Sequence, residues 1–488
     1  MRRFLLIFLL LLSGCRVGPV YEPPCPVTPN EWKAPPQENV TPLHEVCYWW
    51  EVFQDERLNE LEGLAVASNP NLAVALARIE EAWAMAGISH ADLLPQINAN
   101  PSYNSTGELF KIYLPKNGFG NFLPPGSFPT VYRVHMLQYG FPLNLNYEID
   151  LWGKYRSQFD SAVMNAEAQT EAYHTALLSL TANLATSYYN LRTLDLTVDI
   201  LKRTIESRQK DYQINFSRKE KGLSGSIDVS QASLALSNAE SDYYNAFERR
   251  ALQENLIATY IGVPSSLLQI DRSPLKDEPP IIPPGIPSTI LLQRPDIAQA
   301  ERTMASEHFL INSAYADFFP ALDLTGAIGF LSPDFRQFMT WKSRYWNIGA
   351  NVAQTIFDGG RKQSALEATW ARFNEAEGAY KQQVLVAFQE VEDALSNLEF
   401  QAKQGESLSN SVAAGREASR LSKNRFKNGL VNYFEVTQND RLLLEAEQSH
   451  ATILGLRYLS TIQLIKALGG AWDSSKKIDC AFELDLAE

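Results

Sequence analysis

Residues 154–221 read KYRSQFDSAVMNAEAQTEAYHTALLSLTANLATSYYNLRTLDLTVDILKRTIESRQKDYQINFSRKEK, a run of 68 residues without proline or glycine. Because these two residues are the usual helix breakers, the run predicts one continuous helix of roughly 100 Å at 1.5 Å per residue. Apolar residues recur every seven positions along its middle, and a second set lies three positions further on, which predicts a left-handed coiled coil. The first set is Leu177, Leu184, Leu191, Val198 and Ile205, and the second is Leu180, Leu194 and Leu201.

The long helix belongs to a unit that occurs twice in the chain. Residues 70–73 (PNLA) align with residues 295–298 (PDIA), 225 positions later. Further downstream the matching positions are 207 apart, as in Gly153 with Gly360, Gly222 with Gly429 and Ile261-Gly262 with Leu468-Gly469. The drop from 225 to 207 makes the first copy 18 residues longer between Pro95 and Gly153. The sequence therefore predicts an internal repeat whose first copy carries a longer loop.

Each copy is expected to hold a helix, an extended pair, the long helix, a turn and a medium helix. The expected first helices, residues 71–92 and 296–319, stop before Pro95 and Pro320. After the turn at Gly222 a helix is expected over residues 226–261. Helices 226–261 and 296–319, of 36 and 24 residues, together nearly equal the long one in length. We therefore expect these two to stack end to end beside the long helix.

The extended pair in each copy shows strand periodicity. Odd positions from Tyr139 to Leu151 are apolar, whereas Gln138, Asn144, Asn146 and Glu148 are polar. The second copy repeats the pattern more weakly around Trp346, Ile348 and Val352. One apolar and one polar face is typical of a membrane barrel with a wet lumen, and a half-buried sheet of a soluble protein alternates in the same way. Four strands are too few for a membrane barrel, so we expect oligomerisation, with a trimer of twelve strands preferred to a dimer of eight.

The N-terminus has the features of a bacterial secretory signal. Arg2 and Arg3 precede a short apolar run, and Leu12-Ser13-Gly14-Cys15 follows it. This tetrapeptide predicts a lipobox, with cleavage before Cys15 and a lipid on its thiol; the alternative is an ordinary signal peptide that contains a cysteine. Cys25, Cys47 and Cys480 then remain, an odd number whose disulfide pairing the spacing does not give.

Composition excludes several classes of protein. Charged residues make up 20% and hydrophobic residues 45%, and no apolar stretch of about 18 residues follows the signal. Any membrane crossing by the mature chain must then use strands of a closed barrel. The net charge of -13 argues against nucleic-acid binding. No metalloprotease, nucleotide-binding, nucleophile-elbow or paired-cysteine motif occurs, so we expect no enzyme activity, no metal and no cofactor.

Taken in order along the repeat, four motifs resemble the TolC/OprM family of outer-membrane efflux lipoproteins. They are the segment VGPVYEPP after the lipobox (residues 17–24), RPDI (residues 294–297), FDGGR (residues 357–361) and the turn from Phe426 to Gln438. The resemblance covers nearly the whole mature chain. It implies a homotrimer with a 12-stranded outer-membrane barrel and an α-helical periplasmic tunnel. It also implies docking to a periplasmic adaptor and an inner-membrane transporter.

The two inter-helix turns are the expected functional sites. Gly222 and Gly429 interrupt very long helices, and Asp228 and Glu435 begin the returning helices, where the helix dipole favours a carboxylate. An ordinary first-turn acid explains this placement as well. The resemblance implies a periplasmic gate lined by Asp228, Glu435 and Gln438, with Phe426 packing nearby. It also implies adaptor contacts at Gly222, Leu223, Gly429 and Leu430. The family often has aspartate at both positions held here by Glu435 and Gln438, so this constriction would carry less charge.

The sequence therefore predicts a mainly α protein with a membrane β-barrel that serves as the exit duct of a tripartite efflux pump. The alternatives are the outer-membrane component of a type I secretion system and a non-conducting coiled-coil lipoprotein. The loop from Gly107 to Thr130, rich in glycine and proline, is expected outside the cell. The expected segments are a signal peptide (1–14), a lipid-anchored equatorial segment (15–69), the first repeat (70–262, hairpin 96–152), a Pro-rich equatorial linker (263–294), the second repeat (295–470, hairpin 321–358) and an equatorial C-terminal tail (471–488).

Overall fold

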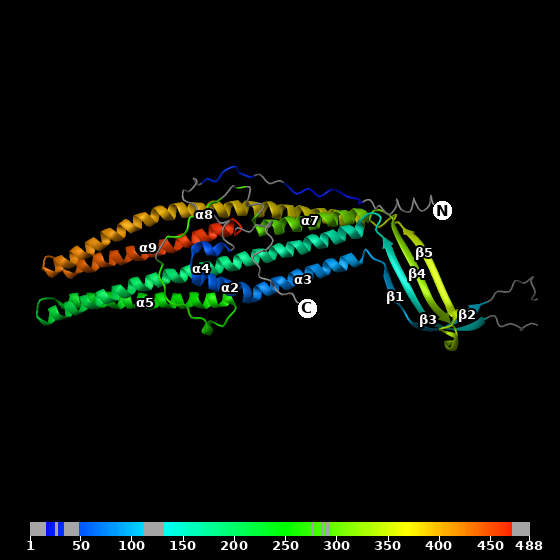
Figure 1. Ribbon diagram of the computed structural model, residues 1–488, viewed down its shortest axis with the longest axis horizontal. Coiled ribbons are helices and arrows are strands. Elements are labelled where there is room, and N and C mark those ends of the chain that lie inside the picture. The colour runs from blue at the N-terminus through cyan, green and yellow to red at the C-terminus, as the bar shows by residue number, and fades with distance from the viewer. Residues whose placement is uncertain are drawn as a thin grey trace, which may run out of the picture. The chain divides into compact units, whose positions relative to one another are not determined.

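A computed structural model describes residues 16–24, 28–33, 48–111, 131–275, 278–284, 287 and 293–470. The expected signal peptide, the lipid site Cys15, the other three cysteines, most of the 107–130 loop and the C-terminal tail lie outside these residues. The α-helices are α2 (Glu56–Ser68), α3 (Pro70–Ala91), α4 (Lys154–Glu220), α5 (Ser226–Ile261), α7 (Pro295–Ala316), α8 (Arg361–Lys427) and α9 (Tyr433–Ala467). Short 3-10 helices are η2 (Trp49–Phe53), η4 (Ser265–Leu267), η6 (Phe335–Gln337) and η7 (Trp341–Ser343). The strands are β1 (Gln96–Ala99), β2 (Ser102–Lys111), β3 (Val131–Ile149), β4 (Ala321–Ser332) and β5 (Arg344–Ala353) (Figure 1).

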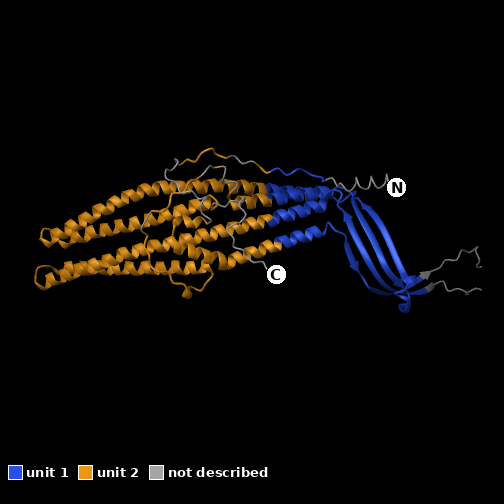
Figure 2. Cartoon of the chain, viewed as in Figure 1, with its two compact units in different colours: residues 1–22, 82–166, 304–375 blue, residues 23–81, 167–303, 376–488 orange. Residues whose placement is uncertain are grey.

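The chain forms two compact units, and each takes segments from both repeats (Figure 2). Unit 1 comprises residues 1–22, 82–166 and 304–375, and it contains the whole sheet. Unit 2 comprises residues 23–81, 167–303 and 376–488, and it contains α2, α5, α9 and most of α4 and α8. The long-helix prediction is confirmed, because α4 and α8 are each 67 residues long. Among the described helices, none is both long enough and apolar enough to cross a bilayer.

The sheet of unit 1 repeats one register in both copies. Its strands are antiparallel, in the order β1-β3-β4-β5, with β2 also pairing with β3. Gln96 faces Asn146 in the first copy, and Ala321 faces Ala353 in the second. Shifts of 225 and 207 positions carry the first pair onto the second. The predicted duplication and its 18-residue offset are therefore confirmed residue by residue in the hydrogen-bonded register.

In unit 2 the seams of the long helices are buried as predicted. On α4 the fully buried side chains include Leu184, Leu191 and Val198. On α8 they include Val391 with the small Ala387 and Ala394. Small residues let neighbouring helices approach closely, and the same closeness occurs where Gly455 of α9 meets Thr193 of α4. Coiled-coil packing of the helical hairpins therefore supplies most of the core of unit 2.

The helices that stack end to end are not the expected ones. Gly262, which ends α5, lies against the Ser68 carbonyl just before α3, and Asn69 Nδ2 donates to the Tyr260 carbonyl at 2.7 Å. In the second copy, Gly469 after α9 lies against the Gln293 carbonyl, and Arg294 donates to the Ala467 carbonyl at 2.9 Å. Thus α5 stacks on α3 and α9 on α7, within each repeat. The expected stack of helices 226–261 and 296–319 was wrong because the side chain before each helix-starting proline binds the helix end of its own repeat.

One further helix prediction needs correction, and one helix was not predicted. The expected helix 296–319 ends at Ala316, because tight turns that bond Phe318 to Tyr315 and Phe319 to Ala316 replace the last helical turn before Pro320. Sequence reasoning also missed α2. It begins at the N-cap Asp55, whose carboxylate accepts from the backbone N–H groups of Arg57 and Leu58 at 3.0 and 3.1 Å.

The segment just after Cys15 is held by other parts of unit 1, to which it belongs, and residues 16–21 are called the clasp below. Arg16 lies 2.8 Å from the Asp160 carboxylate and covers the ring of Phe309 at 4.6 Å. Val17 N–H donates to the Trp152 carbonyl, and the Tyr21 ring lies 5.3 Å from the imidazole of His308. Burial and the neighbouring Arg16 charge lower the pKa of His308, which favours the neutral imidazole. The clasp is thus held by an ion pair, a backbone bond and aromatic packing.

Candidate functional site at the helical turns

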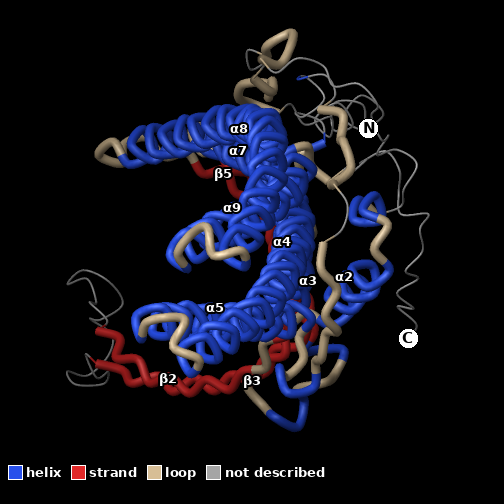
Figure 3. The backbone as a smooth tube through the Cα atoms, turned by 90° about the vertical axis from the view of Figure 1, so that its left-hand side faces the viewer, coloured by secondary structure: helices blue, strands red, loops and turns tan. Residues whose placement is uncertain are grey.

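Both inter-helix turns are built in the same way. Gly222 has a φ of 71° and Gly429 a φ of 73°, the left-handed conformation that favours glycine. In the first turn Gly222 N–H bonds to Lys219 and Leu223 N–H to Arg218; in the second, Gly429 bonds to Phe426 and Leu430 to Arg425. These bonds satisfy the last carbonyl groups of α4 and α8. The two turns lie at the same end of unit 2 in Figure 1 and face the viewer in Figure 3.

Each turn exposes an apolar pair to solvent. Leu223 and Leu430, expected from the sequence, are two-thirds exposed. Four positions later Ile227 and Phe434 are exposed to a similar degree, and these residues were missed. Because 227 and 434 differ by the repeat interval of 207, the duplication itself was a signal that could have found them. Two equivalent apolar pairs at one end of the hairpins form a surface suited to protein contact.

The expected gate carboxylates lie in the first turns of the returning helices. Asp228 of α5 accepts a hydrogen bond from the Ser224 hydroxyl. Glu435 of α9 pairs with Arg425 of α8 at 3.0 Å, and its backbone N–H donates to the cap residue Asn432 at 3.2 Å. Gln438 is half-buried one turn further along. In one chain both carboxylates have local partners, so the electrostatic repulsion of a gate would arise only where several chains meet.

Phe426 contacts both hairpins. Its ring lies 5.5 Å from Tyr433 of α9, and the guanidinium of Arg218 on α4 covers it at 4.8 Å. With Tyr212 it flanks a buried cluster of Ala232, Tyr433 and Val436. The cluster and its two flanking rings together include residues from all four helices, so they join the two hairpins close to their turns.

A buried ionic group, which sequence reasoning missed, lies next to this cluster. Asp440 of α9 is 3.4 Å from Arg208 of α4 and 3.0 Å from Lys423 of α8, and it accepts from the Ser419 hydroxyl. Burial raises the pKa of the neighbouring Asp211, with Lys423 opposing the shift. No local motif announces this group, since its members are far apart in sequence. It ties the first hairpin to the second by charge, as the Phe426 cluster does by packing.

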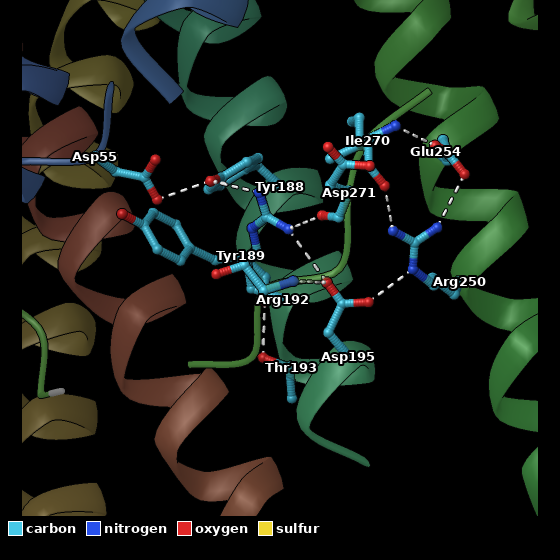
Figure 4. Close-up of polar contacts among 11 residues, drawn as sticks. Asp55, Tyr188, Tyr189, Arg192, Thr193, Asp195, Arg250, Glu254, Ile270 and Asp271 are labelled. Carbon is cyan, nitrogen blue, oxygen red and sulfur yellow. Dashed lines mark hydrogen bonds and ion pairs between the residues drawn. The ribbon is translucent and has the colours of Figure 1, made fainter. Parts of the chain in front are cut away.

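A second buried network fixes the crossing segment after α5 (Figure 4). Asp195 of α4 is fully buried between Arg192 and Arg250, at 3.2 and 2.6 Å. The two guanidinium groups also donate to backbone carbonyls of Asp271 and Ile270, each at 2.6 Å. Each buried charge therefore has a partner, as burial requires. The network holds the start of the Pro-rich linker on α4 and α5, which is a structural role.

None of the described residues forms a group of three or more histidine, cysteine or acidic side chains suited to a metal ion. In the ionic groups above, acids and bases compensate one another, both within a helix and between neighbouring helices. The arrangement is therefore suited to holding helices in defined positions.

Comparisons with known proteins agree with this reading. A family model described as Outer membrane efflux protein matches residues 61–263 and 286–470. The outer membrane protein OprJ of Pseudomonas aeruginosa is 27% identical over 483 residues, covering 97% of this chain and 96% of that protein. The probable outer membrane lipoprotein SilC of Salmonella typhimurium is 27% identical over 476 residues, 95% of this chain and 97% of that protein.

Among solved structures, the outer-membrane channel OprN matches with a TM-score of 0.84 and 26% identity, over 94% of this chain and 100% of that one. The match confirms a mainly helical fold of long helices with antiparallel strands. The chain therefore belongs to the outer membrane efflux protein family, and the expectation of an efflux channel rather than an enzyme is confirmed.

Proposed function

We propose that this protein is the exit duct of a tripartite efflux pump, working as a homotrimer anchored by a lipid on Cys15. Three copies would place twelve strands in a closed outer-membrane barrel and their helical hairpins in a periplasmic tunnel. The family membership carries the proposal, and the duplicated register supports it because each chain supplies two equivalent wall segments. Substrates would be delivered by an inner-membrane transporter and pass through without chemical change.

The turn surfaces supply the contact with the rest of the pump. The exposed pairs Leu223 with Ile227 and Leu430 with Phe434 would bind a periplasmic adaptor. In a ring of three chains, Asp228, Glu435 and Gln438 would line the entrance, with Phe426 packed behind them. Three or more carboxylates near one axis repel one another unless cations or hydrogen bonds intervene. The pairs Ser224–Asp228 and Arg425–Glu435 would provide this compensation in the closed state.

The gate is tested by removing its carboxylates. Asp228→Ala with Glu435→Ala should raise the single-channel conductance in planar lipid bilayers several-fold, because the pairs that hold the turns are lost. Glu240→Ala with Glu447→Ala is the matched control. It removes two carboxylates at repeat-equivalent positions further from the turns, and it should leave conductance at the wild-type level.

Two outcomes would count against the proposal in different ways. Equal conductance of the assembled gate variant and wild type would leave Asp228 and Glu435 with only their first-turn role. Absence of conductance in every correctly inserted form would reject the duct itself and favour a non-conducting coiled-coil lipoprotein.

A further inference from the structure

We propose that the hairpin tip, residues 333–344, binds phosphate-bearing lipid headgroups of the outer leaflet through Arg344 and Lys342. The hairpin tip follows β4 and ends with the first residue of β5, at the end of the sheet away from α7 (Figure 1). All of its residues belong to unit 1. The inference rests on the outer-membrane barrel proposed above and adds a lipid site to it.

The two faces of the unit 1 sheet carry charges of opposite sign. Because side chains alternate along a strand, the strand registers assign each residue to one face. The polar face, which includes Asn144 and Asn347, holds the carboxylates of the described strands: Glu108, Glu148 and Asp323. The apolar face, which includes Ile328 and Trp346, holds their arginines: Arg133 and Arg344. Cations of the strands therefore lie on the face that would contact lipid.

Arg344 lies at the end of the apolar run of β5. Exposed Trp346, Ile348 and Val352 share its face. At 3.3 Å per residue and a strand tilt of 35–45°, the run from Arg344 to Val352 covers roughly 20 Å of height. Membrane barrels carry an apolar band roughly 25 Å tall, and a cation is tolerated near its edge but strongly destabilises the midplane. Arg344 is therefore expected at the level of the headgroups.

Aromatic packing folds the hairpin tip toward the apolar face. The ring centroids of Phe335 and Phe338 lie 5.4 and 6.5 Å from that of Tyr139 on β3. Tyr139 pairs with Tyr103 of β2 on the apolar face, and their rings lie 5.0 Å apart. The short helix η6 is thus held on the same side of the sheet as Arg344.

Trp341 positions the Arg344 guanidinium for an anion. The guanidinium carbon lies 3.7 Å from the centroid of the Trp341 ring, which is 77% exposed. A guanidinium stacked on a ring keeps its in-plane N–H groups available, and these can bind two oxygens of one phosphate. Lys342, the next residue in η7, is exposed and supplies a second cation.

The cations of the hairpin tip are not neutralised by the described part of the chain. No described carboxylate forms an ion pair with Arg336, Lys342 or Arg344. Asp334, the one acid of the hairpin tip, caps η6 by accepting from the Arg336 backbone N–H at 2.9 Å. Three cations and one acid give the hairpin tip a charge of +2, in a chain whose net charge is -13. The hairpin tip is therefore a local cationic surface on an acidic protein.

Cations beside exposed apolar side chains fit an amphipathic anion. Phosphate accepts charge-assisted hydrogen bonds from arginine and lysine. Exposed Phe335, Met339 and Trp341 lie in the same segment and would contact the acyl chains or the sugar of the same molecule. A free phosphate ion would leave these three side chains uncovered. A lipid with a phosphorylated headgroup satisfies both parts of the surface, so we assign the site to it.

Lipid titration tests the site. The detergent-purified protein is titrated with bis-phosphorylated lipid A, and native mass spectrometry measures the bound fraction. Arg344→Gln with Lys342→Gln should weaken binding roughly tenfold or more, because each cation at a lipid surface adds to the attraction. Arg344→Lys keeps the charge but loses the bidentate geometry, so its binding should lie between the two.

Matched controls separate this site from general attraction between charges. Lys202→Gln with Arg203→Gln removes the same two residue types from exposed positions of α4 and should keep wild-type affinity. Lipid A without its phosphates should bind wild type as weakly as it binds the Arg344→Gln, Lys342→Gln variant. Inorganic phosphate at the same concentration as lipid A should not displace it.

Three results would overturn the site. They are equal affinity of wild type and the Arg344→Gln, Lys342→Gln variant for lipid A, equal binding of lipid A with and without its phosphates, and displacement by inorganic phosphate. Single-channel conductance of the same preparations tests the duct separately. A conducting protein with any of these three results loses only the lipid site, whereas absence of conductance in every form rejects the duct.

A second experiment tests which face of the sheet contacts lipid. Cys25, Cys47 and Cys480 are replaced by serine, and a fluorophore is attached at Ile348→Cys or, separately, at its neighbour Asn347→Cys. In vesicles of phosphatidylcholine with brominated acyl chains, bromine should quench the label at position 348 strongly and the label at 347 weakly. The reverse order would turn Arg344 away from lipid and overturn the site, whether or not the channel conducts.

Discussion

Glu62 is the residue where burial and charge oppose each other most directly. It lies on the packed face of α2, is fully buried, and neither carboxylate oxygen has a hydrogen-bond partner among the described residues. Burial raises the pKa of this carboxyl well above its usual value. The folded protein therefore holds Glu62 protonated at pH values where the unfolded chain ionises it.

Because Glu62 must ionise inside the protein as pH rises, the free energy of unfolding should fall with rising pH. When folding raises the pKa of a carboxyl, that group makes its full contribution to the free energy of unfolding below its pKa in the unfolded chain, here 4.5. That stability is lost as pH rises toward the folded value, at about 1.4 kcal/mol per pH unit. Glu62→Gln should remove this pH dependence of the free energy of unfolding. The stability of the variant relative to wild type should therefore increase as pH rises above 4.5. Thermal unfolding followed by helical circular dichroism at pH 4, 5, 6 and 7 measures it, and parallel curves would refute it.

At the scale of the element, glycines end four helices for two reasons. Gly222 and Gly429 have open space where a side chain would be, so only their backbone conformation requires glycine. Gly262 and Gly469 have the same left-handed conformation and also touch a carbonyl of the segment before the next stacked helix. The first pair shapes the turns, and the second pair permits helix stacking.

This difference predicts unequal costs for the same substitution. Gly429→Ala should destabilise by about 1 kcal/mol, the cost of a left-handed alanine. Gly469→Ala adds a clash, because its Cβ would lie 2.5 Å from the Gln293 carbonyl oxygen, so α7 and α9 must move apart. Its loss of unfolding free energy should be at least twice that of Gly429→Ala in chemical denaturation. Equal losses would show that the stacked helices adjust freely.

Elements with local signals were predictable from the sequence. The absence of breakers from residue 154 onward gave α4 to within one residue. The runs of helix-forming residues that stop before Pro95 and Pro320 located α3 and α7. The turn residues Gly222 and Gly429 followed from the repeat. The helix stacking, α2 and the Asp440 group were not found, because they depend on contacts between distant segments that no local pattern records. Asn69 and Arg294 differ in type yet bind equivalent carbonyls, so sequence similarity alone hid their shared role.

At the scale of the whole molecule, two groups of contacts near the turns join one helical hairpin to the other. Asp440 joins α9 to Arg208 of α4 and Lys423 of α8, and the Phe426 cluster lies beside it. Any opening at the turns that separates the hairpins must break this ionic group. The group therefore sets part of the free-energy difference between closed and open arrangements.

Asp440→Asn should loosen the closed arrangement. Removing the Asp440 carboxylate takes the ion-pair partner from the buried Arg208, a change that typically costs about 3–5 kcal/mol in a buried pair. The neighbouring Asp211 offsets part of this cost. Partly exposed Lys423 can turn to solvent, so a value near the lower limit is expected. Resting conductance in planar bilayers should rise, whereas Asp393→Asn at an exposed position of α8 should change nothing. If the Asp440→Asn channel kept the wild-type resting conductance, the contact between the hairpins would be assigned to the Phe426 cluster alone.

The clasp at residues 16–21 would set the length of chain between the protein and the lipid proposed on Cys15. With a lipid on Cys15, the next residue, Arg16, is already paired with Asp160, so roughly 3.5 Å of chain would separate the acylated residue from the start of the clasp. On a long flexible linker, the acyl chains could move through a large volume. A linker this short would keep their effective concentration high beside the clasp. The acyl chains and the strands of unit 1 would then enter the same small area of the bilayer. Once either had inserted, insertion of the other would be a nearly intramolecular step.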